Sequence, residues 1–148
     1  MMKVIFACIH NAGRSQMAAA FFNQMADPSK AQAISAGTAP AAHVHPEVVE
    51  TMEELGLNLS NAVPQQLTES LASGAQWLIT MGCAEQCPYV PGLRREDWAL
   101  ADPKALPIDE VRAIRDTIRR RAREFLLREK IQQRAEFQAS AGAALQKT

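Results

Sequence analysis

The sequence predicts an α/β domain built around a largely parallel sheet. Two observations support this: short apolar runs alternate with longer amphipathic segments, and turn-forming residues separate the two kinds of segment. The chain has 148 residues, of which 47% are hydrophobic and 22% charged, an ordinary globular composition for a single domain. We therefore interpret residues 1–130 as one domain and residues 131–148 as a C-terminal tail or helix extension.

Four segments have the character of strands. Lys3 to Ala7 is apolar and contains β-branched residues, as expected of a strand buried on both faces. Ala31 to Ser35 is a weaker strand, ended by Gly37, and Trp77 to Met81 is strongly apolar. Arg94 to Trp98 fits a short edge strand.

Helical patterns lie between these strands. Ser15 to Met25 places apolar residues on one stripe and stops at Asp27-Pro28. Pro46 to Leu55 begins with a proline suited to the first turn and ends at Gly56, and Thr68 to Ala72 is a shorter helix.

The longest helix is predicted to begin at Pro107-Ile108-Asp109, with apolar residues at spacings of three and four on its inner face. Two acid-first pairs four residues apart, Asp116 with Arg120 and Glu124 with Arg128, are expected to stabilise its surface.

Charge and hydropathy give no reason to expect nucleic acid or a membrane as partner. Lysine plus arginine total 16 and aspartate plus glutamate total 16, so we interpret Arg119-Arg120-Arg121 as a solvated helix face. No apolar run approaches the roughly 20 residues that span a bilayer. The first apolar stretch ends at His10-Asn11 without a signal-peptide cleavage site, so we expect a cytoplasmic protein.

The most informative segment is Cys8-Ile9-His10-Asn11-Ala12-Gly13-Arg14-Ser15, which follows a predicted strand and opens a helix. Five residues between the cysteine and the arginine let the backbone curl, so that successive N–H groups form a nest for an oxyanion. The helix amino terminus adds partial positive charge there. The oxyanion-binding residues are therefore predicted to be Ile9, His10, Asn11, Ala12, Gly13, Arg14 and Ser15.

Each side chain of this loop has an expected task. Gly13 and Asn11 tolerate backbone conformations that other residues avoid, and Arg14 can offer two parallel N–H donors to a tetrahedral oxyanion. Cys8 is expected to be a thiolate near neutral pH, since helix amino termini and cations favour that form, and Ser15 can donate to it. The alternative is a buried cysteine beside a surface arginine.

The chain has three cysteines, at positions 8, 83 and 87. An odd count without an export signal argues against a structural disulfide framework. Cys83 and Cys87 follow the Trp77 to Met81 strand, so parallel strands would bring all three thiols to one sheet edge, where thiol exchange is geometrically possible. The alternatives are a zinc site, which usually needs four ligands, and an inert Cys87. His43 and His45 precede a helix and fit surface or capping roles better than metal ligation.

Cys8 to Ser15 resembles the phosphate-binding loop of the low-molecular-weight tyrosine phosphatase fold, and the longer string through Gln16-Met17-Ala18 resembles its arsenate reductase branch. Three other stretches are similar to that branch: Ser35-Ala36-Gly37-Thr38, Thr80-Met81-Gly82-Cys83 through Cys87-Pro88, and Glu96-Asp97-Trp98 through Asp102-Pro103. The resemblance spans residues 3 to about 128. It implies a three-layer α/β/α fold with a four-stranded parallel sheet.

The resemblance also implies a reaction, the reduction of arsenate to arsenite for arsenic detoxification. Cys8 would attack arsenate, Cys83 would attack the Cys8 sulfur and release arsenite, and Cys87 would carry the disulfide to the surface, where thioredoxin would reduce it. No cofactor or metal would be bound. Asp102 would be the general acid that protonates the leaving oxygen, with Asp97 as the alternative.

The sequence departs from this branch at several positions. Some relatives use a glutamate at the position of Ala19 in a potassium site, and Ala19 supplies no such ligand. The short spacing between Cys83 and Cys87 also occurs in relatives associated with mycothiol, so mycothiol, glutathione or glutaredoxin compete with thioredoxin as reductant. Lys104-Ala105 replaces the tyrosine pair of typical tyrosine phosphatases.

Two other functions use the same residues. A phosphatase would hydrolyse phosphomonoesters through a phosphocysteine, with Cys8, Arg14 and Asp102 alone. A non-catalytic module would bind arsenite or a soft metal through the three thiols and would have no use for Arg14 or Asp102. Phosphate and sulfate are expected to compete with arsenate, because all are tetrahedral oxyanions.

Overall fold

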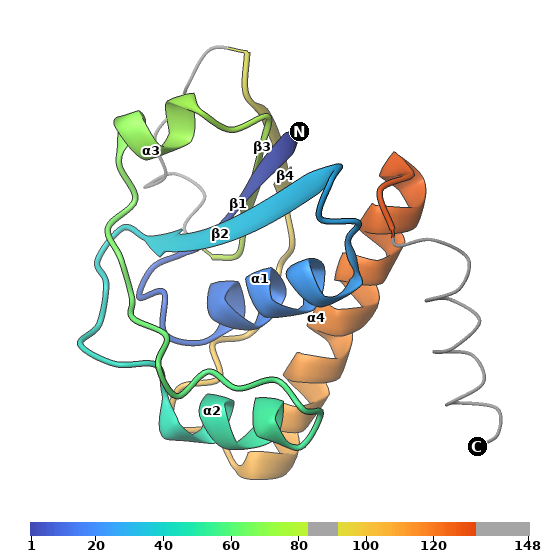
Figure 1. The fold of residues 1–148 in the computed structure, drawn as a ribbon. Helices are drawn as coiled ribbons and strands as arrows, with labels where there is room; N and C mark the ends of the chain where they lie inside the picture. The colour runs from blue at the N-terminus through green and yellow to red at the C-terminus, as the bar shows by residue number, and fades with distance from the viewer. Residues whose placement is uncertain (83–91, 133–148) are drawn as a thin grey trace, which may run out of the picture.

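The computed structural model describes residues 1–82 and 92–132. The elements in chain order are β1 (Met2–Cys8), α1 (Arg14–Met25), β2 (Ala31–Gly37), α2 (Pro46–Glu53), α3 (Glu69–Ser73), β3 (Trp77–Thr80), β4 (Arg94–Asp97) and α4 (Ile108–Glu129). The strands form one parallel sheet in the order β2-β1-β3-β4 (Figure 1). The predicted α/β class and four-stranded parallel sheet are therefore confirmed.

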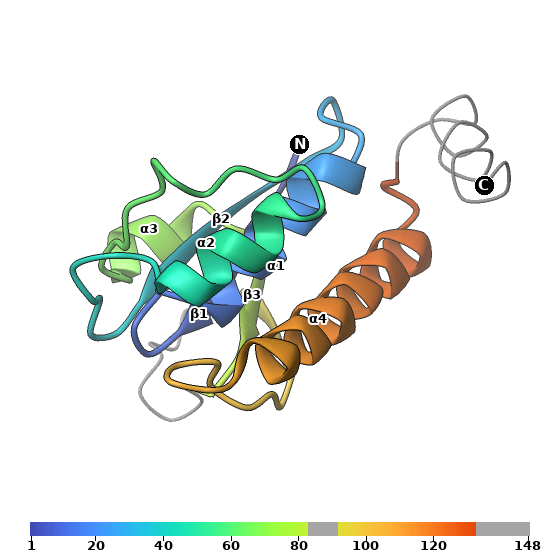
Figure 2. The ribbon, with the colours of Figure 1, turned by 90° about the horizontal axis from the view of Figure 1, so that it is seen from below.

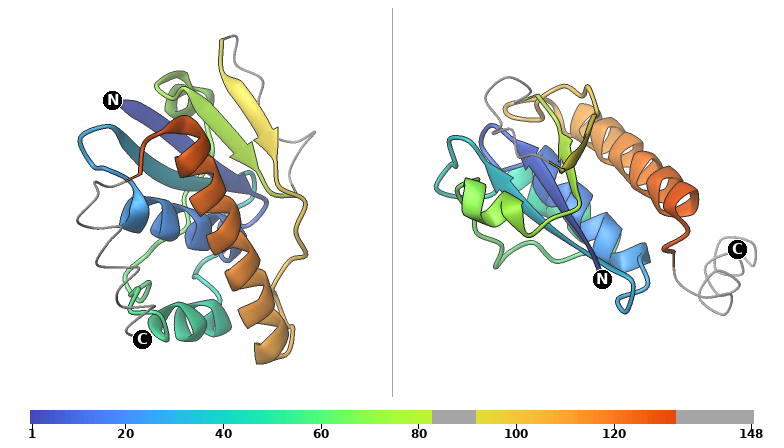
Figure 3. Two further views of the ribbon diagram at one scale, coloured as in Figure 1. Left: turned by 90° about the vertical axis from the view of Figure 1, so that its right-hand side faces the viewer. Right: turned by 90° about the horizontal axis from the view of Figure 1, so that it is seen from above.

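The central strand β1 has a different core on each face, which makes the fold three-layered. Val4, Phe6 and Cys8 face the larger core beneath α1 and α4, while Ile5 and Ala7 face a smaller core beneath α3. Figures 2 and 3 show α1 and α4 side by side on one face of the sheet and α3 on the other. Because both faces are covered, the part of β1 from Val4 to Cys8 is apolar and buried without interruption.

Aromatic rings connect the sheet to the helices of the larger core. Phe6 of β1 lies 5.8 Å from Phe22 of α1 and 5.4 Å from Trp98, measured between ring centroids. Phe125 of α4 continues the row, 6.1 Å from Phe22 and 5.1 Å from Trp77. Such pairs add about 0.5–1.5 kcal/mol each to the burial of the rings themselves. The row fixes α4 against the sheet.

Charged side chains join α2 to α4. Glu54, directly after α2, accepts hydrogen bonds from Arg112 at 2.8 Å and from Arg115 at 2.7 Å. Arg112 also pairs with Asp109, and the buried Arg115 pairs with Asp116. The hydrogen bonds from Arg112, and then those from Arg115, lower the pKa of Glu54 from 4.5 to about 2.

The ion pairs predicted for the surface of α4 are wrong, because their members have other partners, both within the helix and outside it. Arg128 donates to Glu96 of β4 at 2.7 Å and to the adjacent Glu129 at 3.2 Å. Asp116 pairs with Arg115 instead of with the residue four positions later. Helical spacing describes an isolated helix, whereas α4 has charged residues of α2 and β4 beside it.

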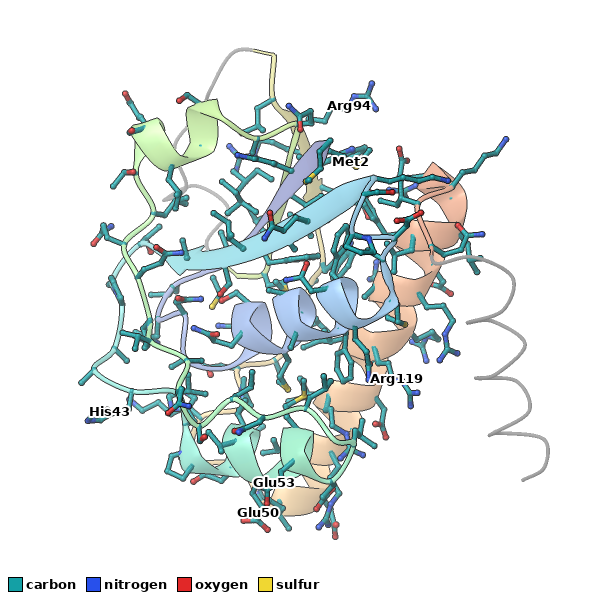
Figure 4. All side chains as sticks on the ribbon, viewed as in Figure 1. Met2, His43, Glu50, Glu53, Arg94 and Arg119 are labelled. Carbon is teal, nitrogen blue, oxygen red and sulfur yellow. The ribbon has the colours of Figure 1, made fainter. Side chains whose placement is uncertain are left out.

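The three consecutive arginines of α4 are only partly the solvated face that the sequence predicts. Arg120 is exposed, whereas Arg119 and Arg121 are half-buried. The guanidinium of Arg121 lies 6.0 Å from the ring centroid of Trp98, which is a cation–π contact. Arg119 projects from α4 in Figure 4.

In the part of the chain that the structure describes, no helix is long and apolar enough to cross a membrane.

The strand β2 lies at one edge of the sheet, and side chains occupy backbone groups along its free side. The Asn23 amide of α1 donates to the carbonyl of Ala33 at 2.9 Å and accepts from the N–H of Ala33 at 2.8 Å. Further along the strand, the Gln65 amide donates to the carbonyl of Ser35 at 2.8 Å. These contacts attach α1 and the segment before α3 to β2.

Candidate active site

The oxyanion loop lies at the carboxyl edge of the sheet, between β1 and α1. Cys8 is the last residue of β1, and Arg14 is the first residue of α1. The Cys8 side chain faces the larger core and is almost completely buried, with 2% of its surface exposed. The predicted strand–loop–helix setting of Cys8 is thus present.

The peptide groups of the loop are oriented by hydrogen bonds to their carbonyl oxygens. Each carbonyl from residue 8 to residue 13 accepts a bond from outside the concave side of the loop. The carbonyls of Cys8, Ile9 and His10 accept from the backbone N–H groups of Thr38, Ala39 and Ala41, respectively. The carbonyl of Asn11 accepts from the Gln16 side chain. The carbonyls of Ala12 and Gly13 accept from the backbone N–H groups of His45 and Met17. In a trans peptide the carbonyl and the following N–H point in opposite directions. The N–H groups of residues 9–14 therefore turn toward the concave side, as the sequence predicts.

Two donor groups lie beside the Cys8 sulfur, and a third hydrogen bond orients one of them. The Asn11 N–H donates to the sulfur at 3.3 Å, and the Ser15 hydroxyl lies 2.9 Å from it. The Asn11 side-chain amide donates to the Ser15 oxygen at 2.7 Å. Because that oxygen accepts from Asn11, the proton of Ser15 is available to the sulfur. The sulfur thus lies within hydrogen-bond distance of two donor groups of the loop and the first helical turn.

Asn11 has the left-handed backbone conformation that the sequence predicts for it, with φ = 50°. The residue is fully buried, and its side-chain oxygen accepts from the N–H of Gln65 at 2.9 Å and from the Gln16 amide at 3.2 Å. These two donors identify which end of the Asn11 amide is the oxygen, so the other end must be the nitrogen that donates to Ser15.

Gly13 permits a close approach that the sequence does not predict. Its φ is −146°, which lies outside the left-handed region. A Cβ at this position would lie 2.7 Å from the Pro103 ring and 3.5 Å from the His45 ring. Glycine is therefore required because Pro103, next to the proposed general acid, packs directly on the loop backbone.

Arg14 is held at the site by groups from two other segments. It is 6% exposed; one terminal nitrogen donates to the carbonyl of Leu100 at 3.0 Å, and the other lies 3.7 Å from the Asp102 carboxylate. Gly82, with φ = +93°, passes so close that a Cβ there would lie 2.6 Å from the guanidinium. Thus Gly82 provides the space that Arg14 fills.

The structure distinguishes the two carboxylates considered as general acid. Asp102 lies beside Arg14, and its side chain is 40% exposed, which allows proton exchange with solvent. Asp97 accepts instead from the Thr80 hydroxyl at 2.8 Å, within the β3–β4 pair. The geometry favours Asp102, whose other oxygen accepts from the N–H of Lys104 at 3.0 Å.

The histidines near the site differ in their surroundings. His45 occupies the N-cap position of α2, without a side-chain cap bond, and its N–H donates to the loop. Partial burial lowers the pKa of His45, and the nearby Asp102 opposes this effect. His43 is exposed and points outward in Figure 4. Across residues 1–82 and 92–132, no cluster of three or more metal-ligating side chains is present.

Cys83 and Cys87 lie outside the described residues. The chain leading to them is described as far as Gly82, and Met81 donates its N–H to the carbonyl of Ala7 at 2.7 Å. Since Ala7 immediately precedes Cys8, the chain reaches the edge of the sheet that carries Cys8 just before Cys83.

Several residues that shape the site were not predicted from the sequence. Gln16 and Gln65 bind Asn11, the Leu100 carbonyl holds Arg14, and Gly82 leaves room for it. Gly82 gave a usable signal, because a glycine directly after a buried strand often marks a close approach of the backbone. The other three act through ordinary amide groups that no sequence pattern distinguishes.

A buried cysteine in a nest of loop N–H groups, with an arginine and a carboxylate beside it, defines enzymes that attack tetrahedral oxyanions with a thiolate. The family model described as low molecular weight phosphotyrosine protein phosphatase matches residues 3–137. The chain belongs to this family.

Relatives within the family give a more specific similarity. The chain is 38% identical over 120 residues to a putative arsenate reductase of Halobacterium salinarum, covering 78% of this chain and 84% of the relative. It is 30% identical over 129 residues to a glutaredoxin arsenate reductase of Synechocystis, covering 85% of this chain and 97% of the relative.

A solved structure shows the same fold. The thioredoxin-dependent arsenate reductase of Corynebacterium glutamicum superimposes with a TM-score of 0.72 at 39% identity. The match covers 84% of this chain but 60% of that one, so the present chain spans less than two thirds of its length.

Proposed function

We propose that this chain reduces arsenate to arsenite. The observation that carries the proposal is the position of the Cys8 sulfur within the oxyanion loop. The sulfur is hydrogen-bonded to the Ser15 hydroxyl and the Asn11 N–H, and the loop lies beside the Arg14–Asp102 pair. The similarity to proteins named arsenate reductases supports arsenate as the substrate. Phosphate and sulfate, which share its tetrahedral shape, are proposed as competitors.

The first step is nucleophilic substitution at arsenic. The loop N–H groups and Arg14 hold the arsenate oxygens, and the Cys8 thiolate forms a sulfur–arsenic bond. One arsenic–oxygen bond breaks, and Asp102 gives its proton to the departing oxygen, which leaves as water. Arsenic remains in the +5 state.

The second step transfers electrons. We assign the attack on the Cys8 sulfur to Cys83, in accordance with the family resemblance. The sulfur–sulfur bond forms as the sulfur–arsenic bond breaks, and its electron pair stays on arsenic. Arsenic falls to the +3 state and leaves as arsenite, while Cys8 and Cys83 each lose one electron. Cys87 then attacks Cys83 and frees Cys8.

An external thiol must return two electrons to complete the cycle. A dithiol protein is the proposed donor, because the Cys83–Cys87 product is a disulfide that dithiol exchange would reduce. Thioredoxin is our first choice, and glutaredoxin or a small thiol such as mycothiol is the alternative. The similarity to a thioredoxin-dependent arsenate reductase and to a glutaredoxin arsenate reductase motivates thioredoxin and glutaredoxin as candidates. No bound cofactor is needed in this cycle.

The decisive experiment follows the thiols without any external reductant. Fully reduced protein is mixed with excess arsenate, and its peptides are mapped by mass under non-reducing conditions while arsenite is measured. We expect one arsenite per chain, a Cys83–Cys87 disulfide and a free Cys8. Three free thiols with no arsenite would contradict an internal relay. In that case, arsenite release that begins only after mycothiol or glutathione is added would identify an external thiol as the second nucleophile.

Two serine variants make this experiment specific. Cys8→Ser is expected to remove arsenite release completely, whereas Cys83→Ser retains the nucleophile and is expected to block only the electron transfer. Steady turnover of Cys83→Ser with thioredoxin would remove Cys83 from the mechanism. Efficient phosphomonoester hydrolysis by Cys83→Ser, without arsenate reduction by the unmodified chain, would favour the phosphatase alternative, which requires only Cys8, Arg14 and Asp102.

A further inference from the structure

Gln16 is a buried polar side chain that the mechanism above does not use. It is 7% exposed and lies in the first turn of α1, one residue after Ser15. Its amide nitrogen donates to two oxygens of Asn11, the backbone carbonyl at 3.1 Å and the side-chain oxygen at 3.2 Å. A single donor group thus connects the backbone and the side chain of the one loop residue with left-handed φ.

Gln65 approaches Asn11 from the other side. Its backbone N–H donates to the Asn11 side-chain oxygen at 2.9 Å, and its carbonyl accepts from Gly37 at 2.9 Å. Its side-chain amide donates to the carbonyl of Ser35, which attaches this segment to β2. Asn11 is therefore held between the first turn of α1 and a segment anchored on the edge strand.

The orientation of Asn11 decides which atom faces Ser15. With the oxygen of its amide occupied by two N–H donors, the nitrogen must face the Ser15 oxygen, to which it donates at 2.7 Å. Ser15 can then give its own proton to the Cys8 sulfur, 2.9 Å away. If the Asn11 amide were reversed, its oxygen would compete with the sulfur for that proton.

We propose that the Gln16 side chain and the backbone N–H of Gln65 are positioning elements that set the reactivity of Cys8 by fixing the orientation of Asn11. The proposal deepens the proposed function, because it names residues that prepare the nucleophile for it. Neither glutamine touches the sulfur; both act through Asn11 and Ser15. The positioning elements carry no titratable group, so they keep the same form across the pH range in which a thiol ionises.

The test measures the nucleophile directly and needs no arsenate. Full-length reduced protein is treated with iodoacetamide from pH 4 to pH 10, and alkylation of the Cys8 peptide is quantified by mass. Gln16→Met keeps the length of the side chain and removes its donor. We expect the pH midpoint of Cys8 alkylation to rise by about one unit, since the hydrogen bonds concerned end on a charged sulfur.

A matched control is available next to Gln65. Gln66 is exposed, and its amide also donates to backbone carbonyls, those of Thr38 and Leu67, without contacting Asn11. Gln66→Met makes the same chemical change outside the set of groups that hold Asn11. We expect it to leave the alkylation midpoint unchanged, and an equal shift in this control would overturn the proposal.

A double variant tests whether Gln16 acts through Asn11. In an Asn11→Ala background there is no amide to orient, so adding Gln16→Met should produce no further shift. A full further shift would show that Gln16 acts by another route. An unchanged midpoint in the folded single variant would also overturn the proposal.

If Gln16→Met does not fold, Gln16→Glu keeps the shape of the side chain and places a carboxylate against the two Asn11 oxygens. Its repulsion of those oxygens is expected to raise the pH midpoint of Cys8 alkylation at least as far as the shift expected for Gln16→Met. An unchanged midpoint would overturn the proposal. Because alkylation requires no arsenate, these outcomes stay separate from those that test arsenate reduction.

Discussion

Two polar networks of this molecule are built from different materials. Around Cys8, neutral amides and a hydroxyl form the chain from Gln16 through Asn11 to Ser15. Between α2 and α4, Glu54 instead joins Arg112 and Arg115, an arrangement of full charges. The first network is buried and the second lies mostly at the surface.

The difference teaches what each network can be used for. Neutral hydrogen bonds respond little to salt and pH, so they suit a site that must keep one geometry while an anion enters and leaves. Ion pairs near the surface are screened by salt and depend on the ionisation of the carboxylate. They suit the joining of two helices, where a small loss of stability leaves the chemistry intact.

Substitution of Arg14 is expected to have the largest effect, because it removes the charge on which the loop relies. Arg14→Ala should lower kcat/KM for arsenate about 1000-fold, in the range seen when a donor to a developing negative charge is deleted. The folded structure should survive, since the loop carbonyls keep their partners. Steady-state arsenite production with excess reductant provides the measurement.

Arg14→Lys tests whether geometry or charge matters. Lysine keeps the charge but cannot offer two parallel donors, and it cannot reproduce both the Leu100 contact and the oxyanion contact. It should recover only a small part of the lost activity. Full recovery would mean that charge alone holds the oxyanion.

Substitution of Asp102 is expected to have the second largest effect. Asp102→Asn keeps the shape but cannot donate a carboxylic acid proton, so arsenate turnover should fall about 100-fold, the usual scale of general acid catalysis. Asp97→Asn is the control, because Asp97 is bonded to Thr80 in the β3–β4 pair. Equal losses in the two variants would argue against Asp102 as the acid.

Substitution of Glu54, which joins Arg112 and Arg115, is expected to have the smallest effect and to change only the stability of the fold. The folded pKa of Glu54 is about 2 and its ordinary value is 4.5, so its contribution is present above pH 4.5 and is lost as the pH falls toward 2. Glu54→Gln should therefore lower the urea midpoint at pH 7 and converge with the unmodified chain at low pH.

Salt and activity measurements sharpen the contrast. High salt should narrow the stability gap between Glu54→Gln and the unmodified chain, whereas the alkylation of Cys8 should change little. Arsenate turnover of Glu54→Gln at 25 °C should equal that of the unmodified chain. A large loss of turnover would mean that the two networks are coupled.

The fold was predictable because its pattern is local and repeated. The buried strand at β1, the apolar stripe of α1 and the proline that begins α2 each lie within two residues of the predicted positions. The family resemblance supplied the number and parallel direction of the strands, whereas their order in the sheet came from the structure. The surface pairs of α4 failed because Glu96 and Glu54 lie far away in sequence, and spacing rules consider only neighbours on the helix.

The site was predictable where a residue has a distinctive chemistry. Cys8, Arg14 and Asp102 combine reactivity with position, and the structure brings the last two within 3.7 Å. Gln16 could not be predicted as part of the site, because an amide in a first helical turn is usually exposed and unremarkable in a sequence. The reason for Gly13 also needed the structure, since Pro103 lies 90 residues later in the chain.

The contact between Asn23 and β2 has a consequence for the behaviour of many copies together. An edge strand with free N–H and C=O groups is a template on which another chain can add a strand and begin to aggregate. Here the Asn23 amide occupies both groups of Ala33 at the middle of β2. An incoming strand would have to displace it, so this asparagine of α1, together with Gln65 at Ser35, protects the β2 edge of the sheet from strand addition.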